Sequence, residues 1–164
     1  SWFHDIILQY QMAPFSLNVL SLERTFFEKL MAVNRLSYDG TENLKGKLRH
    51  FYDLYQLYHN THLKTSIFNI TNFAILDLVK KDDERLKTFH GEWLGKPLAQ
   101  SPLFTAIEAT WQKLASQFNS EIMELTWGQK FTSSAEIIEI LKMAKSFIEK
   151  YDQRTQTQPP VTLN

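Results

Sequence analysis

One cation and one anion are the residues whose types and positions best suit chemistry. Lys29 lies in ERTFFEKLMAVNR beside the apolar residues Phe26 and Leu30, so that its stem can cover apolar surface while its ammonium reaches into a cleft. An ammonium group is a compact charge that suits phosphate oxygens. Asp53 lies in RHFYDLYQL, where a carboxylate among apolar side chains costs free energy to desolvate unless a partner or a metal compensates. Lys29 and Asp53 are therefore candidate site residues, and the interpretation developed below depends on their pointing into one shared cleft.

A simpler account of Asp53 is an ion pair within one helix. Arg49 precedes it by four residues, and such a pair contributes about 0.3 to 0.5 kcal/mol. The acid follows the base, however, which is the less favourable order along a helix. The residues alone therefore leave open whether Asp53 is a structural residue or a site residue.

The segment from Arg24 to His50 carries a local excess of basic residues. It holds six Lys or Arg (Arg24, Lys29, Arg35, Lys45, Lys47, Arg49) against three acids (Glu28, Asp39, Glu42), whereas the whole chain has 18 of each charge. This excess could form a phosphate-facing patch. Ordinary solvated helix faces have the same composition, and charge alone favours that plainer interpretation.

Motifs for several common chemistries are missing from the sequence. It has no Gly-rich phosphate loop, no Gly-x-Ser-x-Gly elbow, no cysteine and no Asp-x-Asp pair to hold magnesium. His59 and His62 are three residues apart and could share a metal, but solvated imidazoles near a helix end are the plainer explanation. No metal site is therefore predicted from these residues.

Composition limits the class of protein. A chain of 164 residues with 43% hydrophobic residues can bury a core as one domain, or as a domain with an appendage. The balanced charge gives no long-range field towards nucleic acid or an anionic membrane. No apolar run approaches the ~20 residues that a membrane-spanning helix needs. Together with the absence of cysteine, these features favour a cytoplasmic protein that has no membrane partner.

Apolar residues spaced by three or four predict a mainly α-helical bundle that positions the two charged residues. Helices are expected at about 22–38, 41–59, 70–88, 103–125 and from Ser133 or Ser134 to about 151. The first two form a hairpin with a short link at Asp39 and Gly40, so that their polar faces can meet.

The start of the chain contains the best strand candidate. PFSLNVL alternates apolar and polar residues, and a strand needs partners for its main-chain groups, so we expect a short N-terminal strand left over from an α/β sheet. We divide the chain into the end of this sheet region at 1–20, a helical domain at 21–151 and a disordered tail at 152–164. The unpartnered strand and a start at Ser1 without Met lead us to expect a truncated protein or a fragment, although a processed terminus would look the same.

Two spaced motifs occur in the runs LSLERTFFEKLMAVNRL and KLRHFYDLYQL. The first has the pattern Lys-hydrophobic-x-Ala-x-x-Arg, and the second contains Asp-Leu; the matching residues are Lys29, Leu30, Ala32, Arg35, Asp53 and Leu54. These runs resemble the latter half of the AbiEii/AbiGii family of nucleotidyltransferase toxins, which belong to the DNA polymerase beta-like superfamily. The resemblance is specific over about residues 15–60, and beyond them it is a similar order of helices.

The resemblance implies roles for four residues. Lys29 would contact nucleotide phosphates and Asp53 would help to organise the active site, so that both count as catalytic. Arg35 would support one of them. Arg49 would lie beside Asp53, as an orienting partner or a second phosphate contact.

The family's earlier motifs are missing from this sequence. They are a Gly-Ser on a turn and an Asp-x-Asp that binds two Mg²⁺ ions. Phosphoryl transfer depends on metals to neutralise the moving charge, so we expect the 164 residues alone to be inactive and to bind no cofactor.

We therefore interpret the chain as the C-terminal helical part of an AbiEii-like nucleotidyltransferase. As the resemblance implies, the intact enzyme would contain an N-terminal nucleotidyltransferase domain and would use Mg²⁺ and an NTP to modify an acceptor such as tRNA or another RNA. Its setting would be a bacterial toxin–antitoxin or phage-defence system, with an antitoxin as a further partner.

Two other interpretations stay open. The helices could form a noncatalytic protein-interaction module, in which the charged residues only decorate a bundle. Alternatively, the helical region alone could bind nucleic acid, with an affinity that falls steeply as salt is added.

Overall fold

The computed structural model describes residues 20–85, 91–127 and 134–157. Within these ranges the chain forms α-helices and short 3-10 helices and contains no strand, which confirms a mainly α fold. The α-helices are α2 (Leu22–Leu36), α3 (Thr41–Lys45), α4 (Leu48–Tyr58), α5 (Phe73–Arg85), α6 (Pro102–Thr105), α7 (Ile107–Leu125) and α8 (Ser134–Thr157). The 3-10 helices are η1 (Ser37–Asp39), η2 (Ile70–Asn72), η3 (Gly91–Trp93) and η4 (Leu98–Gln100). The expected strand at PFSLNVL falls outside the described residues, except for its last residue, which is not in a strand.

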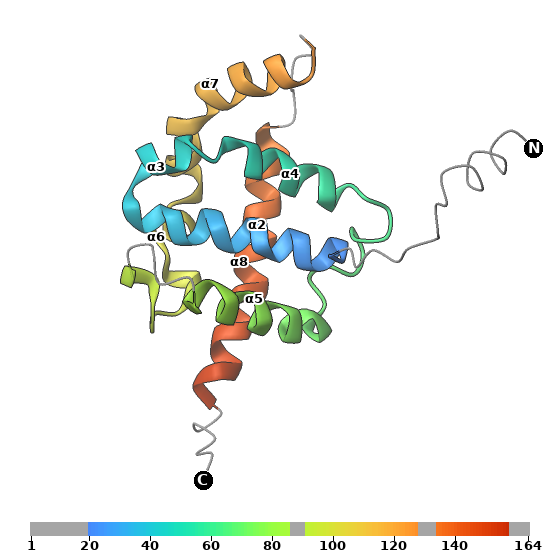
Figure 1. Cartoon of the computed structure of the whole chain (residues 1–164), viewed down its shortest axis with the longest axis vertical. Coiled ribbons are helices and arrows are strands. Elements are labelled where there is room, and N and C mark those ends of the chain that lie inside the picture. The colour runs from blue at the N-terminus through green and yellow to red at the C-terminus, as the bar shows by residue number, and fades with distance from the viewer. Residues whose placement is uncertain (1–19, 86–90, 128–133, 158–164) are drawn as a thin grey trace, which may run out of the picture.

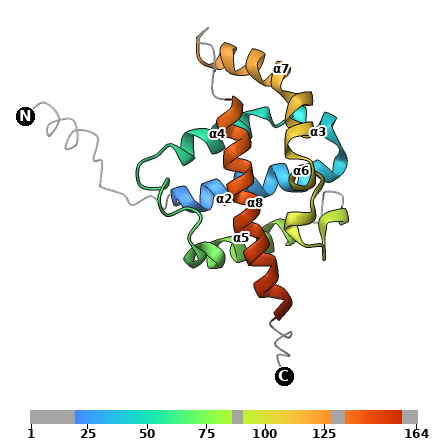
Figure 2. The same ribbon diagram turned by 180° about the vertical axis from the view of Figure 1, so that it is seen from behind.

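α2 is the central helix of the fold. Its N-terminus is capped by Ser21, whose side-chain oxygen accepts a hydrogen bond from the Arg24 N–H at 3.1 Å. α2 packs against α4 on one side and α5 on the other (Figure 1). The view from behind shows α8 crossing these three helices (Figure 2). The hairpin of α2 and α4 is therefore packed against α5 through α2 and against α8 and α7 through α4.

Aromatic packing joins α8 to the rest of the core. The ring of Phe147 on α8 stacks on Phe27 of α2, with centroids 5.4 Å apart, and also contacts Phe73 of α5 at 5.0 Å. On α7, Trp111 contacts Phe51 of α4 in an edge-to-face arrangement at 5.6 Å. These contacts fix the orientation of the face on which α2 and α4 meet.

Two of the expected helices are interrupted. The one predicted at 41–59 divides into α3 and α4, with a break at Gly46 and Lys47. Glycine is a poor helix former, so a break there has little cost. The one predicted at 103–125 divides into α6 and α7 at Ala106, whose backbone leaves the helical region (φ −144°, ψ 50°).

α8 extends further than the sequence indicated. It continues to Thr157, whereas a disordered tail was expected from residue 152. The reason is burial at that point: the Asp152 carboxylate accepts hydrogen bonds from the backbone N–H groups of Leu98 (3.1 Å) and Ala99 (2.8 Å). Burial raises the pKa of the Asp152 carboxyl, and these two N–H donors oppose the rise. Residues 158–164 lie outside the described residues.

Candidate functional site

A pocket of about 430 Å³ lies between α2 and α4. It is lined by Thr25, Lys29, Asp53, Gln56, Leu57 and Asn60. Inside it, the Lys29 ammonium nitrogen is 3.1 Å from Asp53 Oδ2, and each of these side chains is 30% exposed. At that exposure an ion pair contributes only about 0.5 kcal/mol to folding, because water screens it. The pair is therefore a minor part of the stability, and its charges remain open to a ligand.

The apolar faces of the two helices determine this arrangement. Phe26 and Leu30 flank Lys29 on α2 and are buried, and Leu54 beside Asp53 on α4 is buried as well. When these apolar faces pack together, Lys29 and Asp53 are left at the rim of the interface, facing one another. The expected shared cleft is therefore present.

The other two predicted site residues do not line this pocket. Arg35 extends towards α5, where one of its guanidinium nitrogens is 3.7 Å from the Asp83 carboxylate. Burial raises the pKa of the Asp83 carboxyl, and the charge of Arg35 acts in the opposite direction. Arg49 is exposed and forms no ion pair with any described residue. Of the two accounts left open for Asp53, the ion pair with Arg49 is not formed: the carboxylate faces α2 and pairs with the less exposed Lys29.

His50 is a neighbour of the site that the sequence interpretation missed. Its Nδ1 atom is buried, lies 3.8 Å from Asp53 Oδ2, and has no hydrogen-bond partner among the described residues. Burial lowers the pKa of His50, the nearby cations Lys29 and Lys47 lower it further, and Asp53 opposes them. On balance these influences favour the neutral imidazole. The only signal in the sequence was its place three residues before Asp53, on the same side of a helix.

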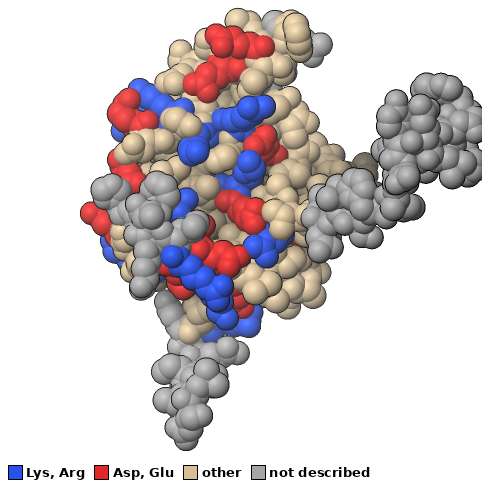
Figure 3. Space-filling view, viewed as in Figure 1, with Lys and Arg blue, Asp and Glu red and all other residues tan. Residues whose placement is uncertain are grey.

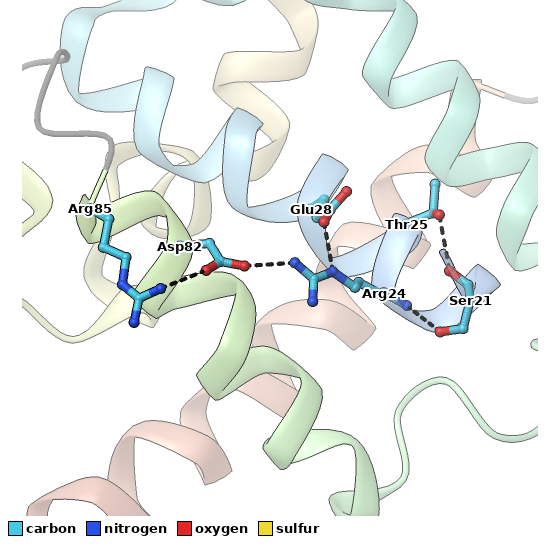
Figure 4. Close-up of polar contacts among 6 residues, drawn as sticks. All are labelled: Ser21, Arg24, Thr25, Glu28, Asp82 and Arg85. Carbon is cyan, nitrogen blue, oxygen red and sulfur yellow. Dashed lines mark hydrogen bonds and ion pairs between the residues drawn. The ribbon is translucent and has the colours of Figure 1, made fainter. Parts of the chain in front are cut away.

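The basic excess between Arg24 and His50 does not form a continuous positive patch. Arg24 binds Glu28 at 2.9 Å and Asp82 of α5 at 2.6 Å, and Arg85 lies on the far side of Asp82 at 3.8 Å (Figure 4). Lys45 likewise pairs with Glu42. On the face of α4, α2 and α5, basic and acidic groups are interspersed (Figure 3). This surface (Figure 3) therefore has the mixed charges of ordinary solvated helix faces and is not a phosphate-facing patch.

The described residues do not suit a Mg²⁺ site. No group of three or more His, Cys, Asp or Glu side chains lies together in residues 20–85, 91–127 and 134–157. Mg²⁺ requires hard oxygen ligands in octahedral geometry, and Asp53, paired with Lys29, offers one carboxylate. His59 Nε2 lies 2.8 Å from a carboxylate oxygen of Glu136 on α8.

In a comparison with known protein families, a family described as nucleotidyl transferase AbiEii toxin, type IV TA system, matches residues 2–138. No curated protein and no solved structure matches the chain significantly. Among the described helices, none combines the length and apolar character needed to cross a membrane.

Proposed function

Because this chain belongs to the AbiEii nucleotidyltransferase toxin family of type IV toxin–antitoxin systems, we propose that it forms the helical part of an enzyme that transfers a nucleotide from an NTP to an acceptor. The acceptor is an RNA such as tRNA. The setting is a bacterial toxin–antitoxin system that acts in phage defence, with the antitoxin as a further partner.

The observation that supports this proposal most is the placement of Lys29 and Asp53 in one pocket. The Lys29 ammonium is positioned to contact phosphate oxygens, and Asp53 holds it there in the absence of substrate. During nucleotidyl transfer, an acceptor hydroxyl gives up its proton to solvent and its oxygen bonds to the α-phosphorus, while the bond to the bridging oxygen breaks and pyrophosphate leaves with that electron pair. A fixed cation beside the phosphates stabilises the negative charge that moves onto the leaving group.

The carboxylates that bind the metal ions lie in another domain of the proposed enzyme. Since the described residues offer no cluster of carboxylates, the proposal places the Gly-Ser and Asp-x-Asp motifs in a nucleotidyltransferase domain that acts together with this chain. The helical part then closes one side of the nucleotide site and helps to shape the acceptor groove. Arg49, which is exposed on α4, is free to contact the RNA backbone or the triphosphate.

A transfer assay tests the proposal. The protein encoded by the complete reading frame is incubated with total RNA and each of the four labelled NTPs in turn. We expect label in RNA with the wild type and none with Lys29→Ala. The matched control is Lys113→Ala, which removes an exposed lysine of α7 outside the pocket and should leave transfer unchanged. No labelling by the wild type with any NTP would overturn the proposal and favour a noncatalytic interaction module.

A further inference from the structure

The pocket between α2 and α4 has a charged end and a neutral end. The two helices run antiparallel (Figure 1), so one turn back along α2 from Lys29 leads in the same direction as one turn forward along α4 from Asp53. One turn of α-helix is about 5.4 Å long. Beyond the ion pair the lining consists of uncharged residues: Thr25, Gln56, Leu57 and Asn60.

The fold leaves the two carboxamides at the neutral end with unused hydrogen-bonding groups. Gln56 is exposed and forms no hydrogen bond with any described residue. Asn60 Oδ1 accepts a hydrogen bond from the His62 N–H at 3.0 Å, which fixes the amide and leaves its NH₂ donors without a partner in the described part of the chain. The Gln56 carboxamide and the Asn60 NH₂ group therefore make no observed contact that the fold requires, whereas Asn60 Oδ1 is held by the turn at His62.

The chemistry of the neutral end suits a nucleobase. A carboxamide carries a donor and an acceptor side by side, which is the pattern on the edge of a base. Leu57 adds half-buried apolar surface against which a flat ring can pack. Gln56 follows Asp53 by three residues, about one helical turn, and Asn60 follows it by seven, so there is room for the sugar between the phosphates and the base.

We propose that Gln56 and Asn60 bind the base of the NTP whose triphosphate lies at the Lys29 and Asp53 end of the same pocket. This inference rests on the proposed function and adds to it the residues that select the nucleotide. Lys29 contributes affinity that is common to all triphosphates. Gln56 and Asn60 contribute affinity that depends on the base.

Binding titrations separate the two contributions. The protein from the complete reading frame is titrated with each of the four NTPs and with inorganic triphosphate, which lacks a base. For the wild type we expect the best NTP to bind at least tenfold more tightly than inorganic triphosphate. Gln56→Ala and Asn60→Ala should each reduce that ratio about tenfold or remove it, and should leave the affinity for inorganic triphosphate unchanged.

The control is Gln112→Ala, the same substitution at an exposed glutamine of α7 that does not line the pocket. It should preserve the ratio. If the wild type binds an NTP and both pocket variants keep its ratio, the inference is wrong while the proposed function stands. An NTP that binds no more tightly than inorganic triphosphate also overturns the inference alone. Failure of the wild type to bind any NTP or triphosphate overturns both.

Discussion

Replacing Lys29 by alanine should affect activity far more than stability. The Lys29 and Asp53 side chains are 3.1 Å apart but each is 30% exposed. Coulomb attraction at that distance is about 1 kcal/mol in water, and exposed pairs contribute about 0.2 to 1 kcal/mol after the side-chain entropy is included. For a chain of this length, a loss of about 0.5 kcal/mol lowers the melting temperature by about 1 to 2 °C. Removing one fixed charge beside the reacting phosphates should slow transfer about 100-fold or more.

The assay combines thermal unfolding with transfer rates for Lys29→Ala, Asp53→Asn and the double variant. The two single variants should show a coupling of about 0.5 kcal/mol in unfolding free energy. In transfer, the double variant should be about as slow as Lys29→Ala alone, because Asp53 acts through the position of the Lys29 ammonium. If the variants lost no more activity than the small decrease in their folded fraction accounts for, the pair would be purely structural, and a catalytic role for Lys29 would be refuted.

Three further predictions concern His50 beside the site and two contacts elsewhere in the fold. The folded-state pKa of His50 lies below its unfolded value, so its contribution to stability is present above about pH 6.5 and is lost as the pH falls through the folded pKa. The drop in unfolding free energy between pH 7.5 and 5.5 should therefore be smaller in His50→Gln than in the wild type, with the same substitution at the exposed His62 as the control. An unchanged drop in His50→Gln would contradict the assignment. Asp152→Ala leaves the buried N–H of Leu98 and the partly buried N–H of Ala99 without their partner and should lower the unfolding free energy in urea by about 2 to 4 kcal/mol. A loss under about 1 kcal/mol would show that α8 is not anchored there. Arg35→Met removes the cation facing the largely buried Asp83 carboxylate, which is 17% exposed, and should cost about 2 kcal/mol of unfolding free energy. Asp83→Asn in the same protein should restore most of this loss; no restoration would mean that Arg35 acts through other contacts.

The sequence predicted those features that depend on residues close together in the chain. Ser21 as a helix cap and the apolar stripe through Phe26 and Leu30 were readable because capping and helical periodicity are local. The same stripes place Lys29 and Asp53 on facing rims of one hairpin, so their meeting could also be inferred.

Features that depend on distant partners were not predictable. Asp152 looked like part of a polar tail, yet its hydrogen-bond partner at Leu98 is 54 residues away in the sequence. The resemblance implied a supporting role for Arg35, and its neighbours in the sequence gave no indication that its guanidinium lies 3.7 Å from Asp83 of α5. Helical spacing offered Arg49 as one possible partner of Asp53, but spacing within one helix takes no account of a competing cation on another helix.

The central claim, that Lys29 binds the triphosphate, is tested most directly by titration with an NTP analogue whose α,β-bridging oxygen is replaced by methylene. Binding to the wild type and to Lys29→Ala is compared at two salt concentrations by calorimetry. We predict that Lys29→Ala weakens binding at least tenfold and reduces the salt dependence of the affinity. Equal affinities for the two proteins would contradict the account.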